Sequence, residues 1–327
     1  MRKLAINLAF ALLLPLAARP ALGEDVVRIG ALKALHYATL WYMPQLSRKY
    51  GVTFEIVEFK KGLDAMEAMK AGAIDIASSG SDGPIAARAA GVPLYIVAGF
   101  SRGGVMIVGR SDLGLKTLAD LKGRKVGVVR GGAQELAMLM ELGKAGLTSS
   151  EKGHKDVTLV YLATYPSLNE ALATKNVDAI CQIEPQAAIA VSKGFGKEIL
   201  KPYDTELGMP VKSVSMSAKF HDERRALAAK AVQAFVEATK LFLDKPDVAK
   251  KFYTETVFKG NLTSEEYDAA IGNSPFGMDV TPEEIQKTID AMVRYGVGRM
   301  EKPPAAKDFV KTDLLALAKK NLGLGPK

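Results

Sequence analysis

The sequence predicts an α/β protein built from two core-bearing halves, each with a mostly parallel sheet and helices on both faces. Three observations support this prediction. The 327 residues are 48% apolar and 24% charged, which is a globular balance, and domains of about 100–200 residues would fit twice. Predicted strands alternate with predicted helices along the chain, as they do in parallel sheets. The chain also contains a diverged internal repeat.

The repeat unit is an amphipathic helix followed by a short polar turn and an apolar strand. At an offset of 103 residues, Asp75 matches Asp178 in this unit. An earlier strand that contains Gly30 matches one that contains Gly127, at an offset of 97 residues. The alternative is a coincidence among alanine-rich helices. Two matching features in the same order favour a duplicated strand–helix unit.

The first half is predicted to alternate strands and helices, with glycines that end the helices. In chain order, we expect a strand at 26–31, a helix near 40–50, a strand at 53–59, a helix at 64–71, a strand at 74–78, a helix at 84–90, and strands at 94–98 and 104–108.

The second half begins with a helical turn that Thr117 caps at its start and Gly123 at its end. We expect strands at 124–129, 157–162, 177–183 and 213–218, and helices at 133–145, 167–174 and after Pro185. Pro is favourable in a first helical turn because its missing N–H has no helical partner there. The remainder is predicted to be helical at 222–243, 246–257, 264–271, 282–294 and 306–320.

Residues 1–23 are predicted to be a signal peptide. Arg2 and Lys3 precede an apolar run at 4–18, and Ala21 and Gly23 supply the small residues of a cleavage site. The run is shorter than the roughly 20 residues that span a bilayer, although a membrane anchor is the alternative interpretation. We therefore expect a protein that is exported to the periplasm.

Cysteine, histidine and charge exclude several classes of protein. Cys181 is the only cysteine, so the mature chain has no internal disulfide and no cysteine near the cleavage site for a lipid. Three widely separated histidines argue against a zinc site or a Cys–His nucleophile. The net charge of +8 includes three basic residues of the signal region, and no dense basic block indicates nucleic acid binding. We expect a soluble monomer without cofactor or metal.

Several short motifs lie in a fixed order over residues 25–300: Lys33 to Trp41, Ala71–Ala77, Thr117–Val128, Gly131-Gly132, Ala145–Leu147, Asn176–Ala179 and Glu184-Pro185. Together they resemble the nitrate-, sulfonate- and taurine-type solute-binding proteins of ABC importers. The resemblance implies a type II periplasmic-binding-protein fold, with the second lobe inserted into the first and a ligand cleft between them. It implies lobe 1 at 24–108 and 214–327, lobe 2 at 109–213, and crossings near 105–112 and 210–217.

The loop that opens the helix after strand 124–129 is the first candidate ligand site. Ligands of open α/β sheets lie beyond the carboxyl ends of the strands. Gly131 and Gly132 allow the backbone to approach a ligand, and the free N–H groups near Ala133 favour an anion. Arg130 would add a bidentate salt bridge. The alternative is a plain tight turn with Arg130 in solvent.

The matching loop of the first lobe supplies Ser79, Ser81 and Asp82 as candidate ligand residues. Asp82 either contacts ligand or only caps the helix that follows. Glu184 lies at the corresponding place in the second lobe. It would accept a hydrogen bond from a ligand amine, orient Arg130, or cap a helix.

An aromatic-rich loop follows the first strand and offers flat rings to an organic ligand. Trp41 and Tyr42 would alternatively be core residues. Ser101-Arg102 would alternatively be the flexible start of the crossing. The remaining candidate ligand residues are Lys33, His36, Tyr37 and Trp41 in the aromatic loop, and Arg102, Thr164 and Tyr165 at the rim.

These features predict a receptor that captures a small organic anion, such as a sulfonate, a carboxylate or a taurine-like solute, and delivers it to a membrane permease of an ABC importer. The alternative ligands are a thiamine-type pyrimidine and an aromatic carboxylate. A ligand-sensing subunit for a membrane kinase is another hypothesis. An enzyme is disfavoured, because the sequence has no nucleophile–base pair, metal cluster or cofactor lysine and lacks the Cys-rich run of the pyrimidine-synthase relatives.

Overall fold

The computed structural model describes residues 25–324, and the predicted signal peptide at 1–23 lies outside them. The strands are β1 (Val26–Leu32), β2 (Thr53–Phe59), β3 (Ile76–Gly80), β4 (Leu94–Arg102), β5 (Val105–Arg110), β6 (Lys125–Val129), β7 (Ser149–Ser150), β8 (Val157–Leu162), β9 (Ala179–Ile183), β10 (Gly196–Leu200) and β11 (Val211–Ser217).

The helices alternate with these strands in both halves and then form a run of helices at the end of the chain. They are α1 (Ala38–Tyr42), α2 (Ser47–Tyr50), α3 (Gly62–Lys70), α4 (Asp82–Ala89), α5 (Ala133–Lys144), α6 (Tyr165–Ala173), α7 (Gln186–Ser192), α8 (Ala218–Glu223), α9 (Arg225–Asp244), α10 (Pro246–Lys251), α11 (Ser264–Asn273), α12 (Pro282–Tyr295) and α13 (Asp313–Asn321). Within the described residues, every helix is too short or too polar to traverse a lipid bilayer.

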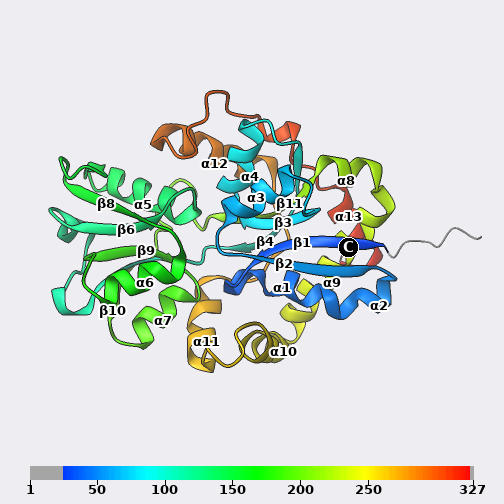
Figure 1. Ribbon diagram of the computed structural model, residues 1–327, viewed down its shortest axis with the longest axis horizontal. Coiled ribbons are helices and arrows are strands. Elements are labelled where there is room, and N and C mark those ends of the chain that lie inside the picture. Colours follow the sequence, from blue (N-terminus) through cyan, green and yellow to red (C-terminus); the bar gives the residue numbers. More distant parts are fainter. Residues whose placement is uncertain (1–24, 325–327) are drawn as a thin grey trace, which may run out of the picture.

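The strands form two sheets, each in its own lobe (Figure 1). The order is β2-β1-β3-β11-β4 in lobe 1 and β10-β5-β9-β6-β8-β7 in lobe 2. The chain leaves lobe 1 after β4, and β5 then pairs antiparallel with β9 and β10 of lobe 2. It returns after β10, and β11 pairs antiparallel with β3 and β4. In each sheet, one strand therefore follows directly in the chain after a strand of the other lobe.

The strand register reproduces the offsets of the sequence repeat. Ile29 pairs with Ile76 in lobe 1, and Val126 pairs with Ala179 in lobe 2. The matched aspartates also make matched contacts. Asp75 accepts a hydrogen bond from the N–H of Arg28, and Asp178 accepts one from the N–H of Lys125. The two lobes thus repeat one local design, and their loops lie at equivalent places.

The crossings and lobe limits differ from the expected positions. Strand pairing places residues 105–108 in the sheet of lobe 2 and residues 211–213 in the sheet of lobe 1. The chain crosses at 103–104 and over 201–210, rather than near 105–112 and 210–217. The reason is that the sequence pattern marks strands by their apolar character but does not reveal which sheet a strand joins.

Two local predictions were also wrong. The helix expected near 40–50 is interrupted by a 3-10 turn at Met43–Leu46, where Pro44 has no N–H for a helical bond. The last helix begins at Asp313 rather than at 306, after a separate 3-10 turn at Ala306–Asp308. The short strand β7 and the strand β10 were not predicted, because neither has a clear apolar alternation.

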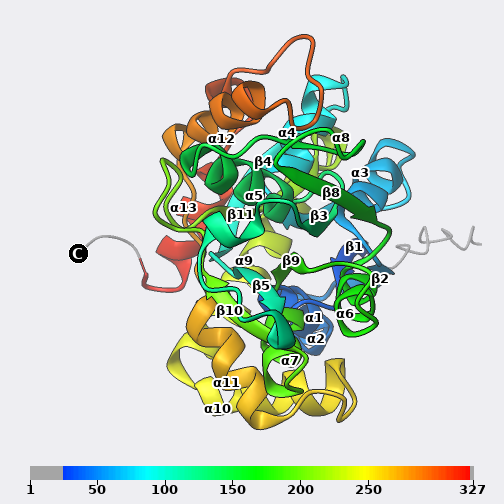
Figure 2. The same cartoon turned by 90° about the vertical axis from the view of Figure 1, so that its left-hand side faces the viewer.

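Helices join the lobes on both sides of the cleft. Leu136 and Met140 of α5 pack with Ile285 and Ile289 of α12 in one apolar cluster. On the other side, Ala188 of α7 joins a cluster formed mainly by residues of lobe 1 around α10 and α11. Figure 2 shows α12 and the α10–α11 pair at opposite ends of the molecule. The lobes therefore rest against each other on two flanks, with the cleft between these flanks.

We expect Asp75→Ala to lower the free energy of unfolding by about 1–3 kcal/mol, because it leaves the N–H of Arg28 and its guanidinium without their acceptor. The carboxylate accepts hydrogen bonds from Arg28 N at 2.9 Å, Nε at 3.1 Å and Nη2 at 2.9 Å. Equilibrium urea unfolding would measure the change. Asp290→Ala is the control, since Asp290 is exposed on α12 and bonds only Gln286. Equal stability of the two variants would contradict the role of Asp75.

Candidate functional site

A small cavity lies between the lobes at the carboxyl ends of the parallel strands, and we call it the inner cavity. It has a volume of about 20 Å³, which is room for about one water molecule. It is lined by Tyr37, Gly62, Ser79, Gly80, Asp82, Gly83, Gly131, Gly132, Ala133, Tyr165, Ile183 and Lys212. Both lobes contribute to the lining, as expected of a ligand cleft that closes.

Three helices begin at the inner cavity. Gly62 is the first residue of α3, Asp82 is the first residue of α4, and Ala133 is the first residue of α5. The residues that precede these helices make no side-chain capping hydrogen bond. Each helix N-terminus carries about half a positive charge on its free N–H groups. Their convergence favours an anion at this point.

A lysine also reaches the inner cavity from the strand that returns to lobe 1. Lys212 of β11 lies beside Gly80 of β3 and Ser101 of β4 in the sheet register. It is only 2% exposed. Burial lowers its pKa to about 7, while Glu184 and Asp82 act in the opposite direction. A buried ammonium group is costly without negative charge nearby, so this lysine depends on the acidic side chains around it or on a bound anion.

Two buried carboxyl groups face this lysine. Burial raises the pKa of Asp82 to about 7, and it also raises the pKa of Glu184. Glu184 accepts hydrogen bonds from Asn273 Nδ2 at 2.8 Å and from the N–H of Ala188 at 3.0 Å. Glu184 is therefore held in place by lobe 1 and by helix α7, behind the cavity.

The crossing at 103–104 runs through a hydrogen-bonded junction. The N–H of Gly104 donates to the carbonyl oxygen of Asn273, and the N–H of Glu184 donates to the carbonyl oxygen of Gly104. Tyr203 of the second crossing donates its hydroxyl to Asn273 Oδ1 at 2.5 Å. A Cβ on Gly104 would lie 2.5 Å from Lys212 Nζ. Only glycine lets the backbone pass this close to the buried lysine.

A second, larger space opens beside the inner cavity, and we call it the outer groove. It has a volume of about 390 Å³ and shares Tyr165 and Ile183 with the inner cavity. Apolar and aromatic side chains from both lobes form much of its wall, with charged groups at the edge. The outer groove is lined by Leu32, Lys33, Ala34, Glu58, Phe59, Lys60, Thr164, Tyr165, Pro166, Ile183, Gln186 and Phe258.

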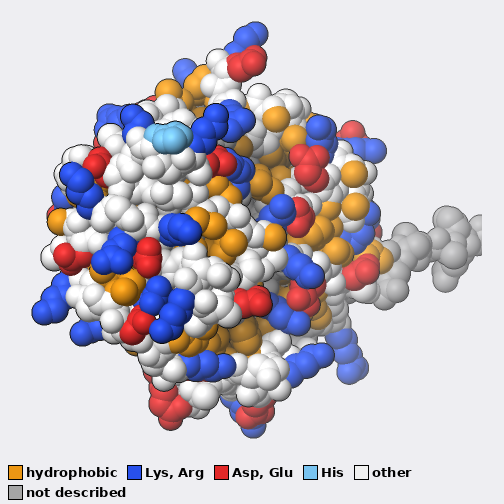
Figure 3. Space-filling view, turned by 60° about the vertical axis from the view of Figure 1, so that its left-hand side comes forward, with side chains coloured by type: hydrophobic (Ala, Val, Ile, Leu, Met, Phe, Trp, Pro, Cys, Tyr) orange, Lys and Arg blue, Asp and Glu red, His pale blue; other side chains and the backbone are white. Residues whose placement is uncertain are grey.

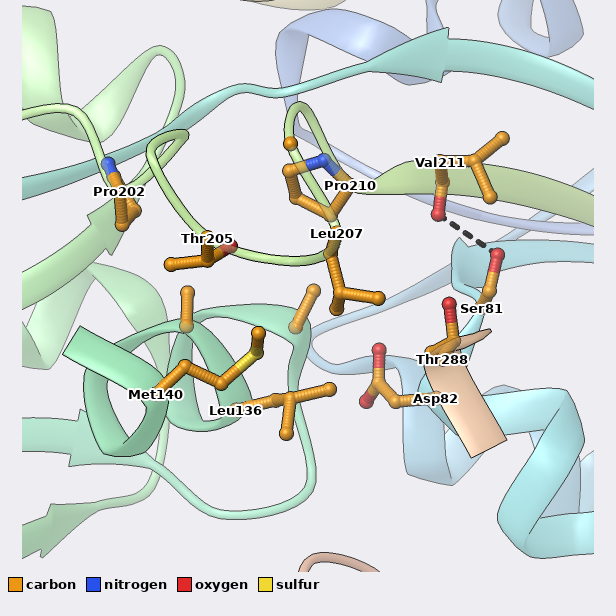
Figure 4. A pocket seen from close by; sticks show the side chains of 13 residues that line it. Ser81, Asp82, Leu136, Met140, Pro202, Thr205, Leu207, Pro210, Val211 and Thr288 are labelled. Atoms are coloured by element: carbon orange, nitrogen blue, oxygen red, sulfur yellow. Dashed lines mark hydrogen bonds between the residues drawn. The ribbon is translucent and has the colours of Figure 1, made fainter. Parts of the chain in front are cut away.

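The crossing at 201–210 lines another small cavity, of about 20 Å³, which shares Asp82 and Ala133 with the inner cavity. Leu207 of this segment lies near Leu136 of α5 and near Asp82 (Figure 4). Ser81 donates its hydroxyl to the carbonyl oxygen of Val211 at 2.8 Å, which fixes the end of the crossing to the loop that carries Asp82. Asp82 therefore lies between the inner cavity and this neighbouring cavity.

The predicted loops at the strand ends meet in the inner cavity, and several predicted residues lie there. These are Tyr37, Ser79, Asp82, Gly131, Gly132, Ala133 and Tyr165. Lys33 and Thr164 line the outer groove instead, where Lys33 also pairs with Glu58 at 3.1 Å. Thr164 additionally caps α6 by accepting a hydrogen bond from the N–H of Ser167.

Other predicted residues point elsewhere. Arg130 stacks on Tyr161, with its guanidinium carbon 3.6 Å from the ring centroid, and pairs with Glu151 at 2.6 Å. It lies outside both spaces, because an aromatic face and a carboxylate on lobe 2 hold it there. Arg102 pairs with Glu284 at 2.5 Å.

Of four more predicted residues, three have structural roles, and the side chain of the fourth lies outside the described part of the chain. Trp41 is partly buried against the core and donates its indole N–H to the carbonyl oxygen of Leu32 at 2.9 Å. Glu184 does not orient Arg130, since its oxygens bond Asn273 and the start of α7. Ser81 bonds the end of the second crossing rather than lining the inner cavity. His36 belongs to the turn Leu35–Tyr37, but its side chain is outside the described part of the chain.

The residue that the sequence analysis missed is Lys212. A lysine two residues after Pro210, at the start of a strand, gives no local sign of burial. The sequence offered one indirect sign: the crossing expected near 210–217 contains Lys212, and charged residues at a crossing lie close to the cleft. Asn273 gave no signal, since its partner Glu184 is 89 residues away in the chain.

The surface carries charges of both signs. Figure 3 shows Lys and Arg side chains scattered over one face and interspersed with Asp and Glu. Among residues 25–324, no group of three or more His, Cys, Asp or Glu side chains is placed to hold a metal ion. The surface charges therefore do not mark the candidate site, whereas the buried Lys212, Asp82 and Glu184 do.

Known proteins share this architecture. The profile described as the NMT1-like family matches residues 22–254. The chain belongs to the NMT1-like family. A protein of Escherichia coli (strain K12), assigned as an aliphatic sulfonates-binding protein, is 33% identical over 204 residues, which cover 60% of this chain and 61% of that protein. The match thus spans less than two thirds of this relative's length.

Two solved structures show the same fold. The alkanesulfonate-binding protein SsuA from Xanthomonas axonopodis pv. citri, bound to MOPS, has a TM-score of 0.77 at 22% identity and covers 88% of this chain and 98% of its own. The periplasmic nitrate-binding protein NrtA from Synechocystis PCC 6803 has a TM-score of 0.77 at 17% identity, with coverages of 92% and 89%. The family member described here therefore has the fold of periplasmic binding proteins, and these relatives are named as binding proteins rather than enzymes.

We expect Gly80→Ala to push the lobes apart. A Cβ at this position would lie 2.9 Å from Ala133 Cβ on the opposite lobe and 2.3 Å from Asp82 Oδ1. Overpacking of this kind costs about 1–3 kcal/mol, so the variant should favour a more open form with a larger radius of gyration. Small-angle scattering of the variant and the wild type measures the difference.

Gly272→Ala is the matched control, because a Cβ at Gly272 meets nothing within 4 Å. Its scattering profile should superimpose on that of the wild type. The contact across the cleft would be refuted if Gly80→Ala gave the same profile as this control.

Proposed function

We propose that the protein is a solute-binding protein that holds a small organic anion between its lobes and delivers it to an ABC importer in the membrane. The observation that carries the proposal is the inner cavity, where Lys212 and the starts of α3, α4 and α5 meet. An anion there would be stabilised by one ammonium group and by backbone N–H groups from both lobes.

The outer groove supports an organic solute rather than a bare inorganic ion. Its wall includes the rings of Phe59, Tyr165 and Phe258, and aromatic rings provide much apolar area with few rotatable bonds. A sulfonate or carboxylate would place its charged group in the inner cavity and its carbon body in the groove. The names of the relatives, which specify sulfonates and nitrate, are consistent with an oxyanion head group.

Delivery of the solute to the importer would depend on closure of the two lobes around it. A ligand that contacts both lobes adds interactions that exist only when the lobes are together, so binding favours the closed form. The permease partner would then recognise the closed protein. Export to the periplasm through the predicted signal peptide belongs to the same proposal.

We expect Lys212→Met to weaken anion binding by about 10- to 100-fold, because a hydrogen bond to a charged group contributes about 1.5–3 kcal/mol. Solute released from the purified protein is first identified by mass spectrometry. Calorimetric titration with that solute, and with a panel of sulfonates, carboxylates and nitrate, then measures the dissociation constant.

Arg130→Met is the matched control for this experiment. It also removes one cation from the loop region, but Arg130 is held by Glu151 and Tyr161 outside the cavity. Its affinity should stay close to that of the wild type. If Arg130→Met weakens binding and Lys212→Met does not, the proposed anion site is wrong. Uptake of labelled solute by cells that carry either variant tests delivery.

A further inference from the structure

The buried charged groups in and directly behind the inner cavity include more carboxylates than a site for a simple anion should tolerate. Lys212, Asp82 and Glu184 are 2%, 4% and 0% exposed, respectively. If all three are ionised, this buried group carries a net charge of −1 before any ligand enters. Adding an anion without compensation would place two uncompensated negative charges in a region that excludes water, which is strongly unfavourable.

Of the two acids, Asp82 is the one whose side chain lines the inner cavity. Glu184 lies behind Lys212, and its two oxygens accept hydrogen bonds from Asn273 and from Ala188. In contrast, Asp82 lines the inner cavity, and its Oδ1 is buried without a hydrogen-bond partner. This oxygen lies close to Gly80, since a Cβ there would be 2.3 Å away. A buried oxygen without a partner requires a donor.

The other groups around Asp82 define its electrostatic surroundings. Lys212 of β11 favours its charged form, whereas Glu135 of α5 opposes it. Tyr37 and Tyr165 also face Asp82, and burial keeps both phenols protonated by raising their pKa values. Burial raises the pKa of Asp82 itself to about 7. Asp82 is thus able to exchange a proton with solvent near neutral pH.

We propose that an anion enters the inner cavity together with one proton, which binds to Asp82 Oδ1 and forms a hydrogen bond to the anion. The balance is simple: an ionised Asp82, one proton from solvent and the anion give a neutral carboxylic acid that donates its O–H to an anion oxygen. The net charge of the site is then −1, the same as before the anion entered. The unpartnered oxygen becomes a donor, as the acceptor-rich ligand requires. This inference rests on the proposed function.

The sign of the pH dependence follows. Below about pH 7, Asp82 is already protonated, and the anion binds without further uptake. Above that pH, each binding event must take a proton from solvent, so affinity should fall by up to about tenfold per pH unit. Lys212 changes affinity in the same direction, because it loses its charge as the pH rises, and the experiment must therefore separate the two groups.

The experiment measures proton uptake by calorimetry. Methanesulfonate is titrated into the full chain at about pH 8 in two buffers of different ionisation enthalpy, and the difference in heat gives the protons bound per anion. The wild type should take up close to one proton more than Asp82→Asn does. Asp82→Asn keeps the size of the side chain but cannot ionise, so the uptake that remains in this variant belongs to Lys212, and its pH profile should be flatter than that of the wild type.

Glu135→Gln is the matched control. Glu135 is a neighbouring buried acid whose oxygens already accept hydrogen bonds from the N–H of Gly131 and from the hydroxyl of Tyr161. This variant should retain the proton uptake of the wild type. Uptake in Asp82→Asn equal to that of the wild type would assign the whole proton uptake to Lys212 and overturn the proposal.

The remaining outcomes separate this inference from the proposed function. If methanesulfonate binds without proton uptake at about pH 8, the proton-linked mechanism is wrong while the anion receptor stands. If 2-aminoethanesulfonate binds and methanesulfonate does not, Asp82 stays ionised and pairs with the ammonium, which also overturns the inference. If no anion of the panel binds, the proposed function fails as well.

Discussion

The burial of one ammonium group between two lobes is the constraint on which the site depends. Lys212 lies on a strand of lobe 1, yet its acidic partners come from helix α4 of lobe 1 and from the end of β9 in lobe 2. An isolated buried charge is destabilising, so Lys212 is stabilised only while these elements stay together. Gly104 lacks a side chain at the point where a Cβ would meet Lys212 Nζ. The crossing at Gly104 and the buried charge of Lys212 are therefore packed against each other, and each constrains the other.

The strand ends and helix starts of the two sheets explain why the buried lysine lies at the candidate site. Parallel strands of both lobes end at the interface, and helices α3, α4 and α5 begin there. The repeat makes these ends equivalent, since Asp75 and Asp178 fix the beginning of matching strands in the same way. The duplicated unit thus places helix N-termini of both lobes at the inner cavity, and β11 adds Lys212 there.

The sequence predicted those parts of the fold and site that follow from local pattern. The two offsets of the repeat relate the strand pairs that are in register in the two lobes. The loops at 79–83 and 131–133 contribute residues to the lining of the inner cavity. The direction of a side chain was not predictable from the same pattern. Arg130 begins at the right loop but is held by Tyr161 and Glu151, and Lys212 depends on partners far away in the chain.

Under the proposed function, different parts of this cleft would select the size and the charge of the solute. The inner cavity has room for about one water molecule in this form, and the lobes already touch where a Cβ on Gly131 would lie 2.8 Å from Leu63. A solute larger than this space must hold the lobes farther apart or extend into the outer groove. Under the proposed function, the length and shape of the solute body would be selected by the separation of the lobes and by the outer groove. Its charge would be recognised by Lys212 and Asp82, which both lie on elements of lobe 1.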